Sequence, residues 1–138
     1  LQKLKDAGIT FGYHNHAHEF FRIADGPVTA YDIFVDEGDQ LLTMEMDTYW
    51  VVHAGVDPIA LAKRLHGRLP VMHLKDKEVA DGEPVMSPIG EGNLNWDGII
   101  AACEEAGTNW YCIEQDVCRR DPFDCLQSSH DFLRQKGL

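Results

Sequence analysis

Basic residues are scarce in this sequence: Lys and Arg together number 12, against 23 Asp and Glu, and the formal net charge is −11. A protein surface that binds nucleic acid needs clustered Lys and Arg, so we expect no nucleic-acid partner. The sequence also lacks a run of about 18 apolar residues, which a membrane-spanning helix would need, and it has no basic and apolar leader. We therefore expect no membrane partner.

Cysteine is sparse as well, and the four thiols include no Cys-x-x-Cys pair, which disfavours a structural zinc site. We interpret Cys103, Cys112, Cys118 and Cys125 as buried or half-buried free thiols in a reducing compartment, and we expect a cytoplasmic protein. The first residue, Leu1, is not Met and falls inside a predicted helix, which suggests a fragment or a processed segment.

What the sequence does contain is a strand-like segment followed by a helix-like segment, repeated four times. The predicted strands are residues 9–16, 41–47, 69–75 and 110–114. The predicted helices are residues 1–7, 29–36, 58–66, 96–106 and 122–136, and Asp57, Asn95 and Asp121 are placed to cap three of them. Loops are predicted at 17–26, where Asp25-Gly26-Pro27 signals a turn, at 48–56 and at 76–94.

Strands that alternate with helices predict an α/β fold in which parallel strands are joined by right-handed crossovers. Four (β/α) units make either a small open sheet or half of an eight-stranded TIM barrel. We expect residues 1–138 to form a single domain. A lone half barrel would leave its apolar interior open, so it should be completed by missing residues or by a second chain.

Each predicted strand ends in two polar side chains separated by one residue, which places both on the same face. The pairs are His14 and His16, Glu45 and Asp47, His73 and Lys75, and Glu114 and Asp116. In a barrel the carboxyl ends of the strands meet at one mouth, so these side chains are within reach of one divalent ion. Such ligands suit manganese, cobalt, iron, zinc or magnesium, and their spacing does not distinguish among these metals.

Five motifs in this order resemble the sugar phosphate isomerase/epimerase family, which belongs to the xylose-isomerase-like TIM barrel superfamily. They are Tyr13-His-Asn-His-Ala-His-Glu-Phe20, Met44-Glu-Met-Asp-Thr-Tyr-Trp50, His73-Leu-Lys-Asp76, the Gly90-Glu-Gly92 turn and Ile113-Glu-Gln-Asp116. Together they cover essentially the whole chain, which corresponds to the second, C-terminal half of the family's barrel.

The resemblance implies a divalent metal held by a Glu, an Asp, a His and a Glu from the last four strands. Asp47, His73 and Glu114 match the last three of these ligands by position. The first strand has a His-Asn-His sequence where many relatives have a Glu. We assign this ligand to Glu19 in the following loop, with direct binding by His14 or His16 as the alternative.

The chemistry that the resemblance implies is proton transfer next to a carbonyl or hydroxyl of a sugar or cyclitol, in an isomerase or epimerase. A bound metal polarises the carbonyl, and carboxylates or imidazoles move the proton. The residues assigned to catalysis are Glu114, His16, His14 and Lys75, and those assigned to substrate binding are Trp50, His53 and Asp116.

Two alternatives stay open. A lyase that dehydrates an inosose or a 3-keto sugar begins with the same proton abstraction, and the His-x-His strand fits it at least as well. A half barrel that binds metal or sugar without turnover would carry the same ligands, since loops of the missing half could complete the pocket. For quaternary structure we expect a homodimer or association with the missing half barrel.

Overall fold

The computed structural model describes residues 1–24 and 26–138, so Asp25 of the predicted turn lies outside the described residues. The described chain alternates strands with helices, as predicted. In order, the elements are α1 (Gln2–Asp6), β1 (Phe11–His14), the short 3₁₀ helix η1 (His18–Phe20), α2 (Ala30–Asp36), β2 (Leu42–Asp47), α3 (Thr48–His53), α4 (Pro58–Arg64), β3 (Val71–Leu74), β4 (Asp76–Ala80), β5 (Glu83–Ser87), α5 (Trp96–Ala106), β6 (Trp110–Ile113) and α6 (Pro122–Lys136).

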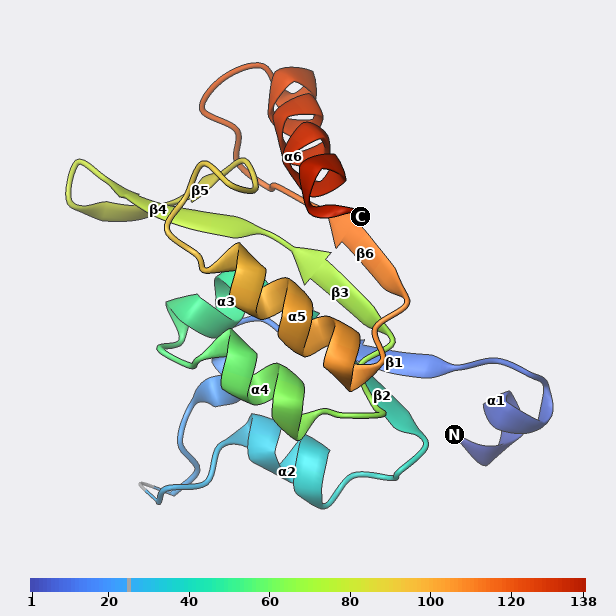
Figure 1. The fold of residues 1–138 in the computed structure, drawn as a ribbon. Coiled ribbons are helices and arrows are strands. Elements are labelled where there is room, and N and C mark those ends of the chain that lie inside the picture. Colours follow the sequence, from blue (N-terminus) through green and yellow to red (C-terminus); the bar gives the residue numbers. More distant parts are fainter. Residues whose placement is uncertain (25) are drawn as a thin grey trace.

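Four strands form one parallel sheet in the order β1-β2-β3-β6 (Figure 1). The register places Asp47 of β2 beside His73 of β3, at the carboxyl ends of both strands. The carboxyl ends of β1 and β6 lie at the same edge because all four strands run in parallel. This arrangement confirms the predicted (β/α) units and brings their polar ends together.

The sheet buries one face against helices. Its outward side chains include Met44, Met46 and Met72, each at most 1% exposed, and they pack in one core with residues of α4 and α5 such as Leu61 and Ile99. Figure 1 shows α4 and α5 side by side across this face of the sheet. None of the described helices is both long and apolar enough to cross a membrane.

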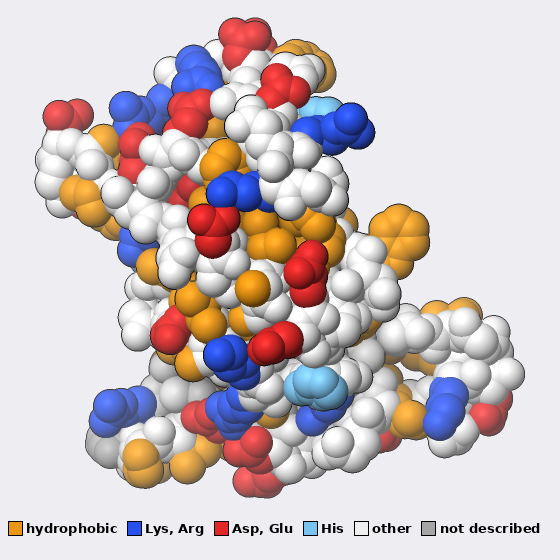
Figure 2. Space-filling view, in the orientation of Figure 1, with side chains coloured by type: hydrophobic (Ala, Val, Ile, Leu, Met, Phe, Trp, Pro, Cys, Tyr) orange, Lys and Arg blue, Asp and Glu red, His pale blue; other side chains and the backbone are white. Residues whose placement is uncertain are grey.

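The opposite face of the sheet, which a full barrel would enclose, is open. It carries a hollow of 490 Å³ lined by Gly12, Thr43, Glu45 and Val71 among others. Trp110, at the start of β6, is 70% exposed there. A second hollow, of 530 Å³, lies between β6 and α6, and Figure 2 shows hydrophobic side chains gathered between α5 and α6. Both hollows lie on surfaces that the missing half of a complete barrel would cover.

Two of the predicted loops were wrong. Residues 76–94 contain an antiparallel hairpin of β4 and β5, which turns at Asp81-Gly82, a pair suited to tight hairpin turns. Residues 48–53 form the helix α3, although several are β-branched or aromatic and favour strands. The helix begins because the Asp47 side chain accepts a hydrogen bond from the backbone N–H of Trp50, 3.1 Å away.

All four cysteines are free thiols, as predicted. Cys103 and Cys125 are buried and Cys118 is half-buried, but Cys112 is exposed, contrary to prediction. Its position on β6 explains the difference, because its side chain belongs to the sheet face that a complete barrel would cover.

Candidate metal centre

The carboxyl ends of the strands bring three predicted ligands, Asp47, His73 and Glu114, into one cluster with His14, the alternative to Glu19 as the fourth ligand. Nε2 of His14 lies 3.4 Å from Oδ2 of Asp47, and Nδ1 of His73 lies 3.8 Å from the same oxygen. Nδ1 of His73 is also 2.8 Å from Oε2 of Glu114, just beyond β6. One ligand atom from each of His14, Asp47 and His73 can be chosen so that all lie within 4.8 Å of one another. This spacing is compatible with a shared metal ion.

Lys75 supplies a positive charge to the same cluster. Its Nζ donates a hydrogen bond to Oδ2 of Asp116 at 3.0 Å and lies 3.1 Å from Oδ2 of Asp47 and 2.8 Å from Oε2 of Glu114. Burial lowers the pKa of Lys75, but these three carboxylates outweigh it and raise the pKa above its ordinary value. Lys75 therefore stays charged and balances part of the negative charge.

Both ring nitrogens of His73 face carboxylates. Nε2 lies 2.8 Å from Oε1 of Glu45, on the side away from Asp47 and Glu114. Interaction with Asp47 is the largest influence on the pKa of His73, and it raises the pKa against the opposing effect of burial. Burial in turn raises the pKa of Asp47, but His73, the backbone N–H of Trp50 and Lys75 hold it below its usual range. Asp47 is thus a carboxylate near neutral pH.

The residues present fit a divalent cation. Four buried side-chain atoms of the cluster lie 2.8–3.8 Å from one another or from Nζ of Lys75 without good hydrogen-bond geometry: His14 Nε2, Asp47 Oδ2, His73 Nδ1 and Glu114 Oε2. Buried polar atoms without well-formed hydrogen bonds are costly, and each of these four can offer a lone pair to a metal ion when it is deprotonated. The carboxylates of Glu45, Asp47, Glu114 and Asp116 also outnumber the single ammonium, so a cation would offset their repulsion.

Two buried residues that support the cluster were not predicted from the sequence. Asn15 is fully buried, and its Oδ1 accepts a hydrogen bond from the backbone N–H of Asp47. The hydroxyl of Thr48 donates to the carbonyl of Lys75 at 2.8 Å and accepts from its N–H at 2.9 Å. The available signal was a polar residue directly after a candidate ligand at a strand end, Asn15 after His14 and Thr48 after Asp47.

Glu19 lies in a different group from the one expected. It is 2% exposed, and its carboxylate accepts hydrogen bonds from the Tyr13 hydroxyl at 2.7 Å and the backbone N–H of His16 at 2.9 Å. Its Oε1 lies 3.3 Å from Nε2 of His18. Burial raises the pKa of Glu19, but the hydrogen bond from Tyr13, backbone N–H groups and His18 hold it below its usual value. The structure thus groups Glu19 with His16 and His18.

The residues predicted to bind substrate lie beside the cluster. The Trp50 ring is 5.4 Å from that of His16 and 5.9 Å from Nζ of Lys75, measured to the ring centroids. His53 lies one turn further along α3, with its ring 5.6 Å from that of Trp50. Asp116 is connected to the cluster because its carboxylate accepts a hydrogen bond from Nζ of Lys75. Trp50 and His53 thus lie together on α3, and Asp116 joins the cluster from beyond β6.

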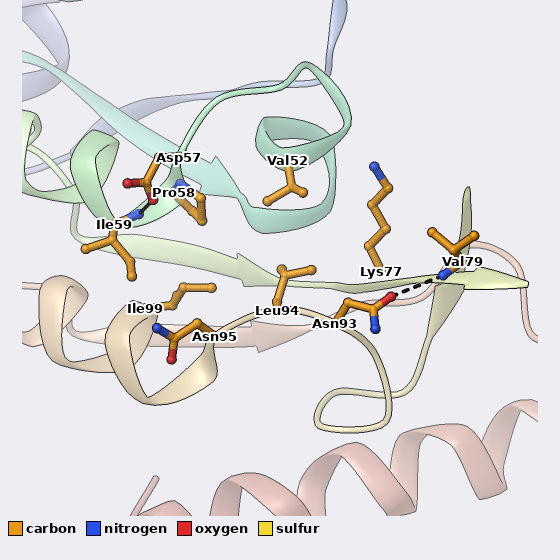
Figure 3. A pocket seen from close by; sticks show the side chains of 10 residues that line it. All are labelled: Val52, Asp57, Pro58, Ile59, Lys77, Val79, Asn93, Leu94, Asn95 and Ile99. Atoms are coloured by element: carbon orange, nitrogen blue, oxygen red, sulfur yellow. Dashed lines mark hydrogen bonds between the residues drawn. The ribbon is translucent and has the colours of Figure 1, made fainter. Parts of the chain in front are cut away.

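An apolar pocket of 340 Å³ lies elsewhere, between α4, α5 and the β4–β5 hairpin (Figure 3). Its walls include Val52, Ile59 and Leu94, with Lys77 and Asn93 at one end. None of the predicted site residues lines it. The polar cluster, rather than this pocket, therefore carries the groups suited to catalysis.

Comparisons with known proteins agree with this geometry. The sequence model of the xylose isomerase-like TIM barrel family matches residues 1–136. An inosose dehydratase from Bacillus thuringiensis (strain Al Hakam) is 25% identical over 154 residues, a stretch covering 96% of this chain and 50% of that protein.

Solved structures resemble the chain over the same span. The crystal structure of a sugar phosphate isomerase/epimerase from Parabacteroides distasonis ATCC 8503 matches with a TM-score of 0.80 and 28% identity, covering 96% of this chain and 49% of that one. A D-tagatose 3-epimerase-like protein matches with a TM-score of 0.65 and 22% identity over 97% and 49% of the two chains, which supports the fold alone. The chain spans about half the length of these relatives, as predicted for a half barrel, and it belongs to the xylose isomerase-like TIM barrel family.

Proposed function

We propose that this chain carries the metal-binding half of a divalent-metal-dependent isomerase or epimerase acting on a sugar or keto sugar. The observation that carries the proposal is the convergence of four buried ligand atoms where the strands end, on His14, Asp47, His73 and Glu114, none of them in a well-formed hydrogen bond. The similarity to a sugar phosphate isomerase/epimerase supports the same class of reaction.

Asp47, His73 and Glu114 are the proposed ligands, and His14 fills the place for which Glu19 was the sequence-based choice. The contact between Nε2 of His73 and Glu45 supports this assignment, because a ligating imidazole usually donates its other N–H to a carboxylate. Nδ1 would then present its lone pair to the ion. A bound divalent ion would polarise a carbonyl and stabilise negative charge that develops on adjacent substrate oxygens.

The other groups of the cluster suit proton transfer. Glu114 is 38% exposed at its side chain and lies at the mouth, so it can reach a substrate proton as well as a metal. His16, which is not among these ligands, would return a proton, because imidazole changes charge near neutral pH. Lys75 would hold an oxyanion or a substrate carboxylate, while Trp50, His53 and Asp116 would contact the sugar or cyclitol ring.

A lyase is the second candidate, and the similarity to an inosose dehydratase favours it. Dehydration also begins with removal of a proton next to a carbonyl, so the same side chains serve both reactions. The open sheet face further supports association with a second half barrel, either another copy or a separate segment. A metal- or sugar-binding half without turnover is the remaining alternative.

Calorimetric titration of manganese and zinc into metal-stripped protein tests the metal centre. We expect Asp47→Asn and His73→Ala to lose binding at this centre. Asp57→Asn is the matched control, because Asp57 also caps a helix, α4, but takes part in none of the cluster's contacts described above, and it should bind as the parent does. Equal binding by all variants would reject this ligand set.

Product analysis then distinguishes the reactions. The protein, loaded with metal, is incubated with keto sugars and with inososes, and the products are identified by mass and stereochemistry. Isomerised products support the leading proposal, and loss of water supports the lyase. Metal binding without any turnover would favour the non-catalytic alternative.

A further inference from the structure

We propose a second divalent metal site, of zinc type, formed by His16, His18 and Glu19 beside the centre described above. One ligand atom from each of the three side chains can be chosen so that all lie within 4.8 Å of one another. Nε2 of His18 is 3.3 Å from Oε1 of Glu19, and the His16 and His18 rings stack 5.8 Å apart at 18°. Two imidazoles and a carboxylate thus converge on one point.

The carboxylate of this group is held in place before any ion binds. Glu19 is 2% exposed, and each of its oxygens accepts one hydrogen bond, Oε1 from Tyr13 and Oε2 from the backbone N–H of His16. Partners of this kind orient a ligand and reduce the entropy lost on metal binding. A second lone pair on Oε1 remains for a cation on the side of His18.

The two histidines leave the site open to solvent. His16 and His18 are both exposed, with the His18 side chain 74% accessible, so an ion can enter without rearrangement of the sheet. Two His and one Glu are a ligand set that zinc takes in catalytic sites, where the fourth position holds water or substrate. The open position would face the mouth of the half barrel.

The second group is separate from the first but next to it. The His14 and His16 rings stack 5.0 Å apart, and no side chain of the second group belongs to the set of His14, Asp47 and His73. An ion on Glu19 would therefore place a second Lewis acid beside the first centre, in reach of a second oxygen of a polyol. The inference stands on its own geometry and does not depend on the proposed reaction.

Zinc stoichiometry tests the proposal. Zinc is titrated calorimetrically into the metal-stripped chain, and the protein is then dialysed and its zinc measured by elemental analysis. We expect two equivalents in the parent, one in His18→Ala, one in Asp47→Asn and none in the double variant. If the first centre binds no zinc, Asp47→Asn and the parent should bind the same number of zinc equivalents. The second site is then tested by comparing His18→Ala with the parent.

His130→Ala is the matched control. His130 also lies next to an acid in sequence and in space, with Nδ1 3.4 Å from Oδ1 of Asp131, but it sits on α6 without a second imidazole. It should keep both equivalents. A parent that binds no zinc, or a His18→Ala variant that binds as many equivalents as the parent, overturns the proposal. So does a Glu19→Gln variant that loses the same equivalent as Asp47→Asn, which would assign Glu19 to the first centre.

Discussion

Nζ of Lys75 lies 3.1 Å from Oδ2 of Asp47, and both side chains are closed off from solvent, at 2% and 0% exposed. A buried ion pair of this kind is sensitive to the loss of one partner, because the remaining charge has no water to solvate it. Lys75 also occupies the side of Asp47 that faces Glu114. It therefore acts as an internal cation for the same carboxylates that we propose as metal ligands.

Lys75→Met should destabilise the metal-free protein by about 3–5 kcal/mol, because Asp47 is left as a buried charge without its partner. Divalent ions should restore more stability to this variant than they add to the parent, since the ion replaces the lost charge and binds only the folded state. Thermal unfolding with and without manganese measures both effects.

Lys136→Met provides the comparison for Lys75. Nζ of Lys136 lies 2.6 Å from Oδ1 of Asp97 on the surface, where the Asp97 side chain is 76% exposed. Such a pair contributes at most about 1 kcal/mol, and its loss should not respond to manganese. Equal destabilisation of the two variants would contradict the role given to Lys75.

Strand alternation explains why much of the fold and the site could be predicted. Asp47, His73 and Glu114 were placed together because residues at matching strand ends share a face and parallel strands end at one edge. The order of strands and helices followed from the same pattern. Loop geometry lacks such a period, so the position of Glu19 depended on hydrogen bonds from Tyr13 and His16 that the sequence does not specify.

The helix α3 and the β4–β5 hairpin were missed for related reasons. In α3 a single cap from Asp47 and tertiary packing of Val51, which is fully buried, override weak helix propensity. The hairpin has a recognisable Asp81-Gly82 turn, but its strands pair only with each other. The contacts of Lys75 with Asp47, Glu114 and Asp116 were equally undetermined, because they depend on side-chain rotamers that the sequence does not specify.

Asp76→Ala should be among the most destabilising substitutions in the chain. The Asp76 carboxylate is fully buried and accepts hydrogen bonds from the backbone N–H groups of Gly90 and Gly92, at 2.9 and 3.1 Å, and from Nε1 of Trp96 at 2.6 Å. Each abandoned buried donor costs about 1–3 kcal/mol, so we expect a loss of at least about 3 kcal/mol. Urea unfolding measures it, and exposed Asp97→Ala should change stability by less than about 1 kcal/mol.

Gly92→Ala should weaken the same loop by a steric route. A Cβ at this position would lie 2.4 Å from Oδ1 of Asp76 and 2.6 Å from the carbonyl oxygen of Lys77, so backbone or the buried carboxylate must move. We expect a loss of about 2–3 kcal/mol. Gly107→Ala is the comparison, because a Cβ at this position meets nothing within 4 Å. Only the positive φ of 89° is unfavourable for alanine, and we expect it to cost about 1 kcal/mol of stability. The reverse ranking of the two variants would reject this explanation.

Glu91 should contribute to acid sensitivity. Arg120 donates two hydrogen bonds to its carboxylate, at 2.7 and 2.6 Å, and together with the Ser128 hydroxyl lowers the pKa of Glu91 from 4.5 to about 2. A folded-state pKa below the unfolded value gives stability that is present above about pH 4.5 and is lost as the pH falls towards about 2. Glu91→Gln should therefore lower the melting temperature at neutral pH, and the difference from the parent should shrink on acidification.

Glu83→Gln separates this effect from the general consequences of removing a carboxylate. Glu83 is exposed at the start of β5, and within residues 1–24 and 26–138 it makes no ion pair. Its substitution should leave the melting temperature close to that of the parent at both pH values, because no charged contact is lost among the described residues. The difference in melting temperature between Glu91→Gln and the parent could instead stay constant from neutral pH to about pH 2. Arg120 would then not stabilise the Glu91 carboxylate in solution, because solvent and salt screen the pair despite its two hydrogen bonds.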